Sequence, residues 1–345
     1  MTGPLPEPAT LVIPFAACSD EHMQAALQAL ALPHLARLLA HMTPTRRDNG
    51  DATSLSPPHE RVLAHCLGMA ADDGKIPWAA WQVAQHHAGL TAQEGGAAHH
   101  AATATATATA TPPDDAWAWI TPCHWQVGID RMTLADPAGL ALDEADSRTL
   151  LAALQPWFAE DGIALHDDTP GRWLARGAVF AGLATASLDR VAGREVDAWM
   201  PRAPQAALLR RLQSEMQMLL YTHPVNDARA QRGLPPVNSF WVSGTGALAA
   251  SLPVRPSWPA QVRVVRELAP AALQRDGAAW AHAWTALDAT EVAALWATLQ
   301  RTGRARLVLC GEHSALTLEV GPRSIFQKIS SFFGTKPPSD ILSLL

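Results

Sequence analysis

A polar, glycine-rich strip at residues 223–246 carries the side chains best suited to bind a ligand. The planar guanidinium of Arg229 can grip a carboxylate or a phosphate with two parallel hydrogen bonds. The amides of Asn226 and Asn238 are suited to orienting hydroxyl or amide groups. The strip ends in Ser-Gly-Thr-Gly at residues 243–246, where glycines let backbone amides converge on an anion. This pattern predicts a site for a small anionic ligand.

The candidate ligand-binding residues are His223, Asn226, Arg229, Asn238, Ser243, Gly244, Thr245 and Gly246. The same residue types also cap helices and form turns, and an arginine often only pairs with a nearby acid. Both interpretations stay open. No catalytic residue can be assigned, since Ser243 lacks a Gly-x-Ser-x-Gly elbow: Trp241 stands two positions before it.

The elements around the strip are predicted from apolar spacing and turn residues. Leucines and methionines recur at helical spacing over residues 206–221, so an amphipathic helix leads directly into the strip. Residues 225–232 form a short helix with Asn226 near its start, and Gly233 ends it in a left-handed turn. A strand follows from residue 239.

Strands and helices alternate along the rest of the chain. Further strands are predicted at residues 11–17, 117–121, 125–134 and 262–268, with hairpins at 162–175 and 306–320. Further helices are predicted at 21–41, 57–69, from 77, and at 143–158, 277–287, 290–301 and 324–333, with a loop at 42–56. The sequence therefore predicts a mixed α/β (α+β) fold, with a sheet covered by helices and a mostly helical N-terminal part.

Three regions differ in texture. Residues 1–94 are mainly helical with one short strand, and residues 114–345 form a mixed α/β domain that carries the strip. Between them, residues 95–113 are rich in alternating alanine and threonine with little to bury, which predicts a flexible linker or insertion.

Composition limits the classes of partner. The chain has 345 residues, 48% hydrophobic and 17% charged, which predicts a packed globule. Its net charge is -6, and the 26 basic residues form no stripe, so we expect no nucleic-acid partner. No apolar run reaches membrane-spanning length, which predicts no membrane partner.

The four cysteines also bear on location. They lie far apart, with no Cys-x-x-Cys and no Cys/His spacing typical of zinc. We expect reduced, mostly buried thiols and no metal ligands among them. Because no charged region followed by an apolar stretch opens the chain, a cytoplasmic location is expected.

The strip also carries a resemblance. His-Pro-x-Asn-x-x-Arg from His223, Gly-x-x-Pro-x-Asn from Gly233 and Trp-x-x-Gly-x-Gly from Trp241 resemble a stretch of the archaeal-type cofactor-independent phosphoglycerate mutases. Most of the chain is similar to a shorter group, the phosphoglycerate mutase-related or RpfE-type regulatory proteins. Short matches to that group stand at residues 58–61, 76–79, 122–125, 136–137, 161–162, 172–173 and 309–312.

The mutase resemblance implies phosphoryl transfer through a phosphorylated serine with two divalent metals, which need several Asp and His ligands. The first metal motif of that family resembles Asp-Gly-x-x-Asp. The Asp-Gly pairs here start at Asp73, Asp161 and Asp276, and none has an aspartate three residues after its glycine. No Asp-His dipeptide occurs either. These differences predict a chain that keeps the strip without the metal core.

Three hypotheses follow. The first is a non-catalytic regulatory or ligand-binding protein related to the mutases, binding a small anion or a partner without a cofactor. The second is an active 2,3-bisphosphoglycerate-independent mutase that uses a divalent metal. The third is a protein-interaction module, in which the tryptophan-rich C-terminal half and the tail at 324–345 bind a protein partner.

Overall fold

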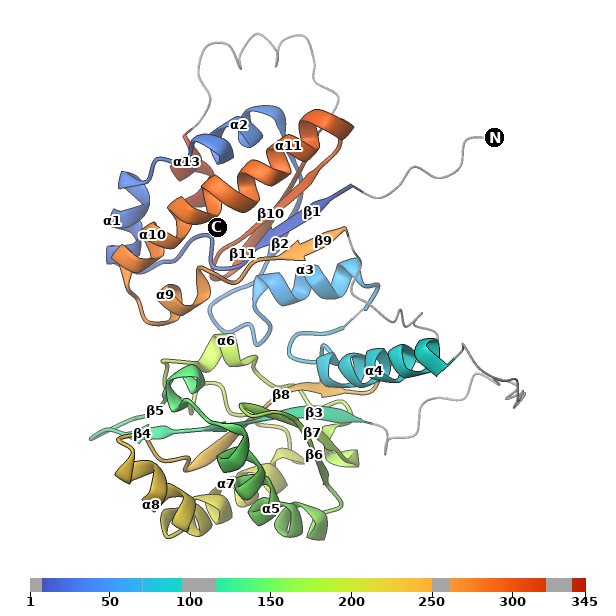
Figure 1. Cartoon of the computed structure of the whole chain (residues 1–345), viewed down its shortest axis with the longest axis vertical. Coiled ribbons are helices and arrows are strands. Elements are labelled where there is room, and N and C mark those ends of the chain that lie inside the picture. The colour runs from blue at the N-terminus through green and yellow to red at the C-terminus, as the bar shows by residue number, and fades with distance from the viewer. Residues whose placement is uncertain (1–7, 70, 95–115, 250–260, 321–336) are drawn as a thin grey trace. The chain divides into compact units, whose positions relative to one another are not determined.

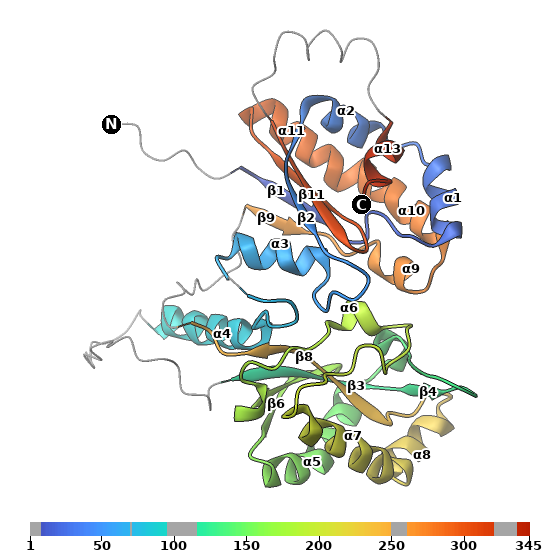
Figure 2. The ribbon, with the colours of Figure 1, turned by 180° about the vertical axis from the view of Figure 1, so that it is seen from behind.

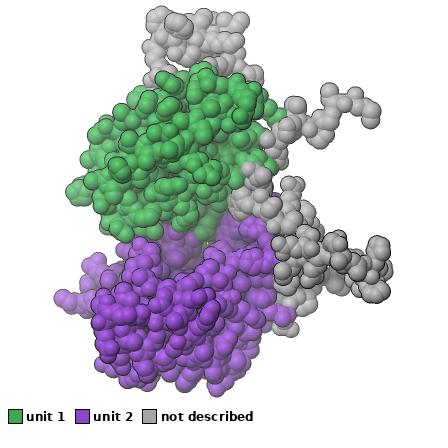
Figure 3. Space-filling view, in the orientation of Figure 1, with its two compact units in different colours: residues 1–63, 258–345 green, residues 64–257 purple. Residues whose placement is uncertain are grey.

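The computed structural model of the chain describes residues 8–69, 71–94, 116–249, 261–320 and 337–345, with the backbone alone from residue 87 to 94. The chain divides into two compact units, which are coloured separately in Figure 3. Unit 1 comprises residues 1–63 and 258–345, and unit 2 comprises residues 64–257. The predicted linker at 95–113 lies outside the described residues, so the domain bounds expected from the sequence stay a prediction.

Unit 1 is built on a five-stranded mixed sheet with the order β2-β11-β10-β1-β9. The strands are β1 (Thr10–Ile13), β2 (Thr43–Asn49), β9 (Val262–Val264), β10 (Arg306–Cys310) and β11 (Ser314–Glu319). β1 lies parallel to both β9 and β10, whereas β11 and β2 run antiparallel to their neighbours. The carboxyl ends of β1, β9 and β10 therefore meet at one edge of the sheet.

Helices cover one face of this sheet (Figures 1 and 2). They are α1 (Glu21–Ala29), α2 (Pro33–His41), α9 (Ala269–Leu273), α10 (Gly277–Leu287), α11 (Ala293–Thr302) and α13 (Pro338–Leu342), while α3 (Pro58–Cys66) crosses the unit boundary. A π-helical turn, Asp288–Val292, joins α10 to α11. Its buried Asp288 accepts hydrogen bonds from the backbone N–H groups of His34 and Leu35, so it caps the start of α2.

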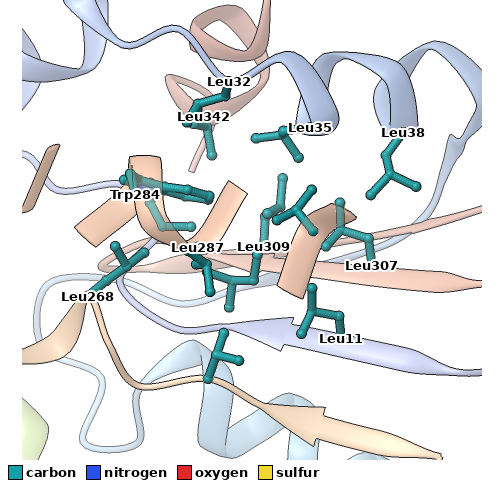
Figure 4. Close-up of a cluster of buried hydrophobic side chains, with 14 of the residues drawn as sticks. Leu11, Leu32, Leu35, Leu38, Leu268, Trp284, Leu287, Leu307, Leu309 and Leu342 are labelled. Atoms are coloured by element: carbon teal, nitrogen blue, oxygen red, sulfur yellow. The ribbon is translucent and has the colours of Figure 1, made fainter. Parts of the chain in front are cut away.

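Alternate strand residues build the core of unit 1. Leu11, Leu307 and Leu309 point from the sheet toward the helices, where Trp284 and Leu287 of α10 meet them (Figure 4). This arrangement follows from the two-residue repeat of a strand, which sends every second side chain to the same face.

Unit 2 holds an antiparallel sheet with the order β6-β7-β3-β8. Its strands are β3 (Trp117–Cys123), β6 (Ala164–Thr169), β7 (Arg172–Arg176) and β8 (Ser239–Gly246), and a separate hairpin joins β4 (Trp125–Val127) to β5 (Met132–Leu134). Its helices are α4 (Trp78–Glu94), α5 (Glu144–Glu160), α6 (Leu188–Val191), α7 (Ala206–Tyr221) and α8 (Pro224–Gln231). In Figure 1, α5, α7 and α8 lie on one side of the sheet, and α4 and α6 lie on the other.

The fold class is confirmed: the chain is mixed α/β, and helices cover its sheets. The helix predicted at 206–221 matches α7, the short helix after it is α8, and Gly233 takes a positive φ of 71° as expected. Asp20 caps α1 by accepting from the N–H of His22.

Three local predictions were wrong. The single strand predicted at 125–134 is a hairpin, in which β4 and β5 pair across a turn. The helix predicted at 21–41 is two helices, because Pro33 lacks an amide hydrogen and fits only the first turn of α2. The loop predicted at 42–56 contains β2, which pairs with β11 at the edge of the sheet. β2 is polar and mostly exposed, so it lacks the apolar alternation that marks a half-buried strand.

In the part of the chain that the structure describes, no helix is both long enough and apolar enough to cross a membrane. The tail helix predicted at 324–333 lies outside these residues.

Candidate functional site

The predicted strip, residues 223–246, folds as α8, a connecting segment and β8 of unit 2. His223 stands at the N-cap of α8, where its Nδ1 accepts a hydrogen bond from the N–H of Val225 at 3.3 Å. Asn226 is buried in the first turn, and its side-chain amide donates to the backbone oxygens of Leu220 and Val237, each at 2.8 Å. Its Oδ1 accepts from the N–H of Val237 at 2.9 Å. Asn226 thus ties the end of α7 to the start of β8.

Arg229 is completely buried, and each of its three guanidinium nitrogens donates a hydrogen bond within its own unit. Nε donates to the oxygen of Pro235 at 3.1 Å, and Nη2 donates to the oxygen of Leu140 at 2.5 Å. Nη1 donates to Oδ2 of Asp146 at 2.8 Å. Arg232 donates to the same carboxylate oxygen at 2.5 Å. The fork that could grip an anion holds a carboxylate of the protein itself.

Asn238 makes a paired contact with one residue. Its Oδ1 accepts from the N–H of Trp125 at 2.7 Å, and its Nδ2 donates to the oxygen of Trp125 at 2.9 Å. The side chain thus accepts from and donates to the backbone of one residue, as a residue on an adjacent β-strand does. Asn238 therefore fixes the chain where β3 passes into β4.

The Ser-Gly-Thr-Gly end of the strip lies in β8, and its glycines make room for neighbours. A Cβ on Gly244 would stand 2.9 Å from the ring of Trp119 and 3.2 Å from Cβ of Trp78. A Cβ on Gly246 would stand 3.1 Å from Cβ of Pro77. Gly244 also has a φ of 63°, which glycine adopts without strain. These positions let α4 and its entry segment approach the sheet.

Thr245 is buried between β8 and a loop. Its hydroxyl donates to the oxygen of Leu183 at 2.6 Å and lies 3.0 Å from the hydroxyl of Thr185. Ser243 is also buried. Asn226 and Arg229 share α8 on one side of the sheet, whereas Thr245 bonds to the segment before α6 on the other side. The structure brings these two groups to different places, and ligand binding by the strip stays a prediction.

A pocket that the sequence did not reveal lies in unit 1, between α1 and the turn that joins α9 to α10. Its volume is about 630 Å³. Its apolar lining consists of Leu30 and small residues: Ala26, Ala29, Gly277, Ala278 and Ala281. Its polar lining consists of His22, Gln274, Arg275 and Asp276. This volume falls within the range of small-molecule sites, roughly 300–1000 Å³.

Close packing of α1 against α10 sets the base of the pocket. A Cβ on Gly277 would lie 3.0 Å from the backbone oxygen of His22, so only glycine leaves the two helices at this separation. Asp276 caps α10 by accepting from the N–H of Ala279 at 2.9 Å. The cap fixes the Asp276 carboxylate against the helix end, next to Arg275.

Arg275 occupies a backbone conformation that glycine normally takes. Its φ is 55°, and its N–H donates to the oxygen of Ala272 at 3.2 Å. The N–H of Asp276 donates to the oxygen of Ala271 at 2.9 Å, which completes a Schellman-type end to α9. A non-glycine residue here costs about 1–2 kcal/mol. Phe15 and Ala141 also have a positive φ among the described non-glycine residues, but of these three only Arg275 lines the pocket.

The two buried cysteines, Cys123 and Cys310, are poor nucleophiles. Cys123 and Cys310 are buried, Cys18 is half-buried and Cys66 is exposed, and none of the four forms a disulfide with another described cysteine. Burial raises the pKa of the Cys123 and Cys310 thiols well above the ordinary value, so both stay protonated near neutral pH.

Within either unit alone, the described residues bring no three His, Cys, Asp or Glu side chains close enough together to share a metal ion.

Comparisons with known proteins give similarities to solved structures alone, all reported ones at low sequence identity. The chain matches no protein-family model, and no curated protein matches it in sequence. Among solved structures, it is similar to the cofactor-independent phosphoglycerate mutase from Thermoplasma acidophilum, with 13% identity over 98% of each chain and a TM-score of 0.33. It is also similar to the PH0037 protein from Pyrococcus horikoshii, with 13% identity over 92% of this chain and 88% of that chain and a TM-score of 0.41.

Proposed function

We propose that this chain is a non-catalytic binding protein for a small organic anion, and that the anion occupies the pocket between α1 and the α9–α10 turn. The observation that carries the proposal is Arg275: it lines the pocket from a strained backbone, and its guanidinium makes no hydrogen bond or ion pair with any described residue. Arg229, by contrast, already bonds to three acceptors of its own unit. Of these two arginines, Arg229 is buried and bonded through every guanidinium nitrogen, whereas Arg275 has its whole guanidinium left for a ligand.

The lining favours a ligand with an acidic group and a compact body. Arg275 and His22 supply donors for a carboxylate or phosphate, and Gln274 supplies an amide that suits a hydroxyl. The alanines of α1 and α10 leave volume for the ligand body while keeping that wall apolar. Asp276 already accepts the N–H of Ala279, which orients its carboxylate toward its own helix. A ligand hydroxyl can share the remaining oxygen.

Binding without conversion suits a regulatory role, because occupancy of the pocket can report the concentration of a metabolite. The mutase alternative differs in one measurable respect, since it requires turnover of 2- and 3-phosphoglycerate. 3-Phosphoglycerate carries both a carboxylate and a phosphate, so one probe addresses binding and turnover together.

The test is a calorimetric titration of the full chain with 3-phosphoglycerate and, separately, with inorganic phosphate. We expect saturable binding of 3-phosphoglycerate that Arg275→Gly weakens about tenfold or more, because a hydrogen bond to a charged group is lost. Arg37→Ala, which removes an exposed arginine of α2 elsewhere on unit 1, is the charge-matched control and leaves the affinity unchanged.

Equal affinities for the unsubstituted chain and Arg275→Gly, or no binding of either probe, would rule out the pocket as the site. The same samples, supplied with manganese, are then assayed for 2-phosphoglycerate. Primer-independent formation of 2-phosphoglycerate would contradict the non-catalytic part of the proposal.

A further inference from the structure

The last residues of the chain, 337–345, return to unit 1 and pack into its core. Leu342 of α13 is fully buried in the cluster formed by α2, α10 and the strands, and Figure 4 shows it in that cluster with Leu32 and Leu35. Ile341 and Leu345 pack against the same cluster. Leu344 faces outward with 51% of its surface exposed. The segment therefore presents an Ile-Leu-x-x-Leu face to unit 1. We call the surface that receives it, made by α2, Arg47, Gly311 and Ser314, the docking groove.

Two hydrogen bonds from unit 1 reach the backbone of this segment. Nη2 of Arg47 donates to the oxygen of Leu344 at 2.6 Å, and the hydroxyl of Ser314 donates to the oxygen of Leu345 at 2.9 Å. Both acceptors are backbone groups, which every peptide carries. These two hydrogen bonds do not distinguish one peptide sequence from another. Selectivity therefore depends on the apolar side chains of Ile341, Leu342 and Leu345.

Gly311 shapes the end of the groove. A Cβ at this position would lie 2.7 Å from both Cβ and the backbone oxygen of Leu345. The crowded atoms all belong to the docked segment, so an alanine at position 311 would push the segment away. A glycine at the hairpin between β10 and β11 is thus matched to a peptide lying on it.

The docked helix is too short to be stable by itself. α13 spans five residues, Pro338–Leu342, whereas an isolated helix needs roughly 12–15 residues to be even marginally stable in water. Its helical turn therefore forms together with its docking. A segment that folds only on its groove behaves as a tethered peptide ligand.

We propose that this groove on unit 1, lined by α2, Arg47, Gly311 and Ser314, is a docking site for short peptides that present an Ile-Leu-x-x-Leu helical turn. In the structure its occupant is the chain's own segment 337–345, and an incoming peptide of the same chemistry replaces it. The inference is independent of the anion pocket, because it concerns a different ligand and different residues.

The test measures binding of a fluorescently labelled peptide of residues 337–345 to the full-length chain by anisotropy. Leu342→Asp removes the buried anchor of the resident segment, and we expect it to bind the peptide about tenfold more tightly than the unsubstituted chain, whose tethered segment competes. Leu344→Asp is the matched control: the same charge stands two residues away on the exposed side, and peptide affinity stays that of the unsubstituted chain. A labelled peptide with aspartate in place of Leu342 does not bind.

A second pair of variants addresses the groove itself. In the Leu342→Asp background, Gly311→Ala abolishes peptide binding, because the added methyl occupies the place of the terminal leucine. Gly171→Ala in the same background leaves binding intact, since nothing lies within 4 Å of its Cβ position. The proposed docking site is wrong if Leu342→Asp and Leu344→Asp bind the peptide with equal affinity, or if Gly311→Ala leaves peptide affinity unchanged.

Hydrogen exchange of the unsubstituted chain tests the inference without a substitution. We expect the amides of 339–345 to exchange through local release, about a hundredfold faster than those of β10 and β11. Exchange at the same rate as the strands would mean that the segment leaves only on global unfolding, which overturns the inference. A dimer that Leu342→Asp converts to a monomer would place the segment on a second copy and overturn docking within one chain.

Discussion

The carboxylate of Asp146 lies 2.8 Å from Nη1 of Arg229, and the arginine is completely buried. Removing the acid leaves a guanidinium in the interior without its charge partner, which costs about 3–5 kcal/mol. We expect Asp146→Ala to lower the free energy of unfolding of unit 2 by that amount, measured by urea denaturation. Glu144→Ala, two residues earlier in α5, is the control. It removes only the exposed ion pair with Arg148, so the free energy of unfolding falls by less than about 1 kcal/mol. Equal effects would contradict a structural role for Arg229.

The stability of the same region depends on pH through Asp143. Its carboxylate accepts the N–H of Asp146 at the start of α5 and pairs with Arg232, and these contacts lower the pKa of Asp143 below its ordinary value. A carboxylate with a lowered pKa stabilises the fold above the pKa of the unfolded chain, and this stabilisation disappears as pH falls through the folded pKa.

Asp143→Asn isolates this charge, because asparagine is also a good N-cap. We expect the unsubstituted chain to be more stable than Asp143→Asn by a constant amount above about pH 5, and the difference to shrink below about pH 4. Urea denaturation of both proteins from pH 7 to pH 3 checks this. A difference that grows on acidification would contradict the assigned contacts.

Gly244 is needed for two reasons, its positive φ and the approach of Trp119, and a matched glycine separates them. Gly233 has a similar φ of 71° but nothing within 4 Å of its Cβ position. We expect Gly233→Ala to cost about 1–2 kcal/mol, the price of the left-handed conformation. Gly244→Ala adds overpacking against the indole ring, for a total of about 2–4 kcal/mol. Thermal and urea unfolding measure both, and equal losses would show that Trp119 yields without cost.

The sequence predicted those elements whose signals are local. The repeat of leucine and methionine gave the bounds of α7, and a glycine after a polar turn gave the end of α8. It could not supply the partners of Arg229, because Leu140 and Asp146 precede it by 89 and 83 residues. The strip was recognised as special, but its chemistry depends on which distant groups fold against it.

The pocket of unit 1 could not be predicted for the same reason. Its walls combine α1, near the start of the chain, with the α9–α10 turn more than two hundred residues later, as the ranges of its lining show. Alanines carry no chemical signal, and Arg275 is unusual only because its φ is positive, which no sequence pattern marks. β2 was missed because its partner strand, β11, rather than its own composition, makes it a strand.

Thiol reactivity should follow burial. Because burial raises the pKa of Cys123 and Cys310, neither forms a thiolate at pH 8, and neither side chain meets solvent. We expect an Ellman titration of the native chain to modify exposed Cys66 first, and the two buried thiols only after unfolding. Cys66→Ser should remove the fast phase and leave the others unchanged. Rapid labelling of Cys310 in the native chain would contradict the buried position of β10.

Arg275 is expected to lower the stability of the fold while it strengthens ligand binding, and a substitution at this position tests both effects. Glycine takes a φ of 55° without strain, so Arg275→Gly is expected to raise the free energy of unfolding by about 1 kcal/mol while it weakens the binding of 3-phosphoglycerate. Gly303→Ala is the mirror-image control: Gly303 ends α11 with a φ of 71° and open space at its Cβ position, so alanine there should cost about 1 kcal/mol and leave ligand affinity unchanged. Differential scanning calorimetry with and without ligand measures both effects in one experiment. If Arg275→Gly stabilises the protein and binding survives, the strain at position 275 belongs to the end of α9 alone; if it destabilises the protein, the guanidinium makes contacts that hold the fold.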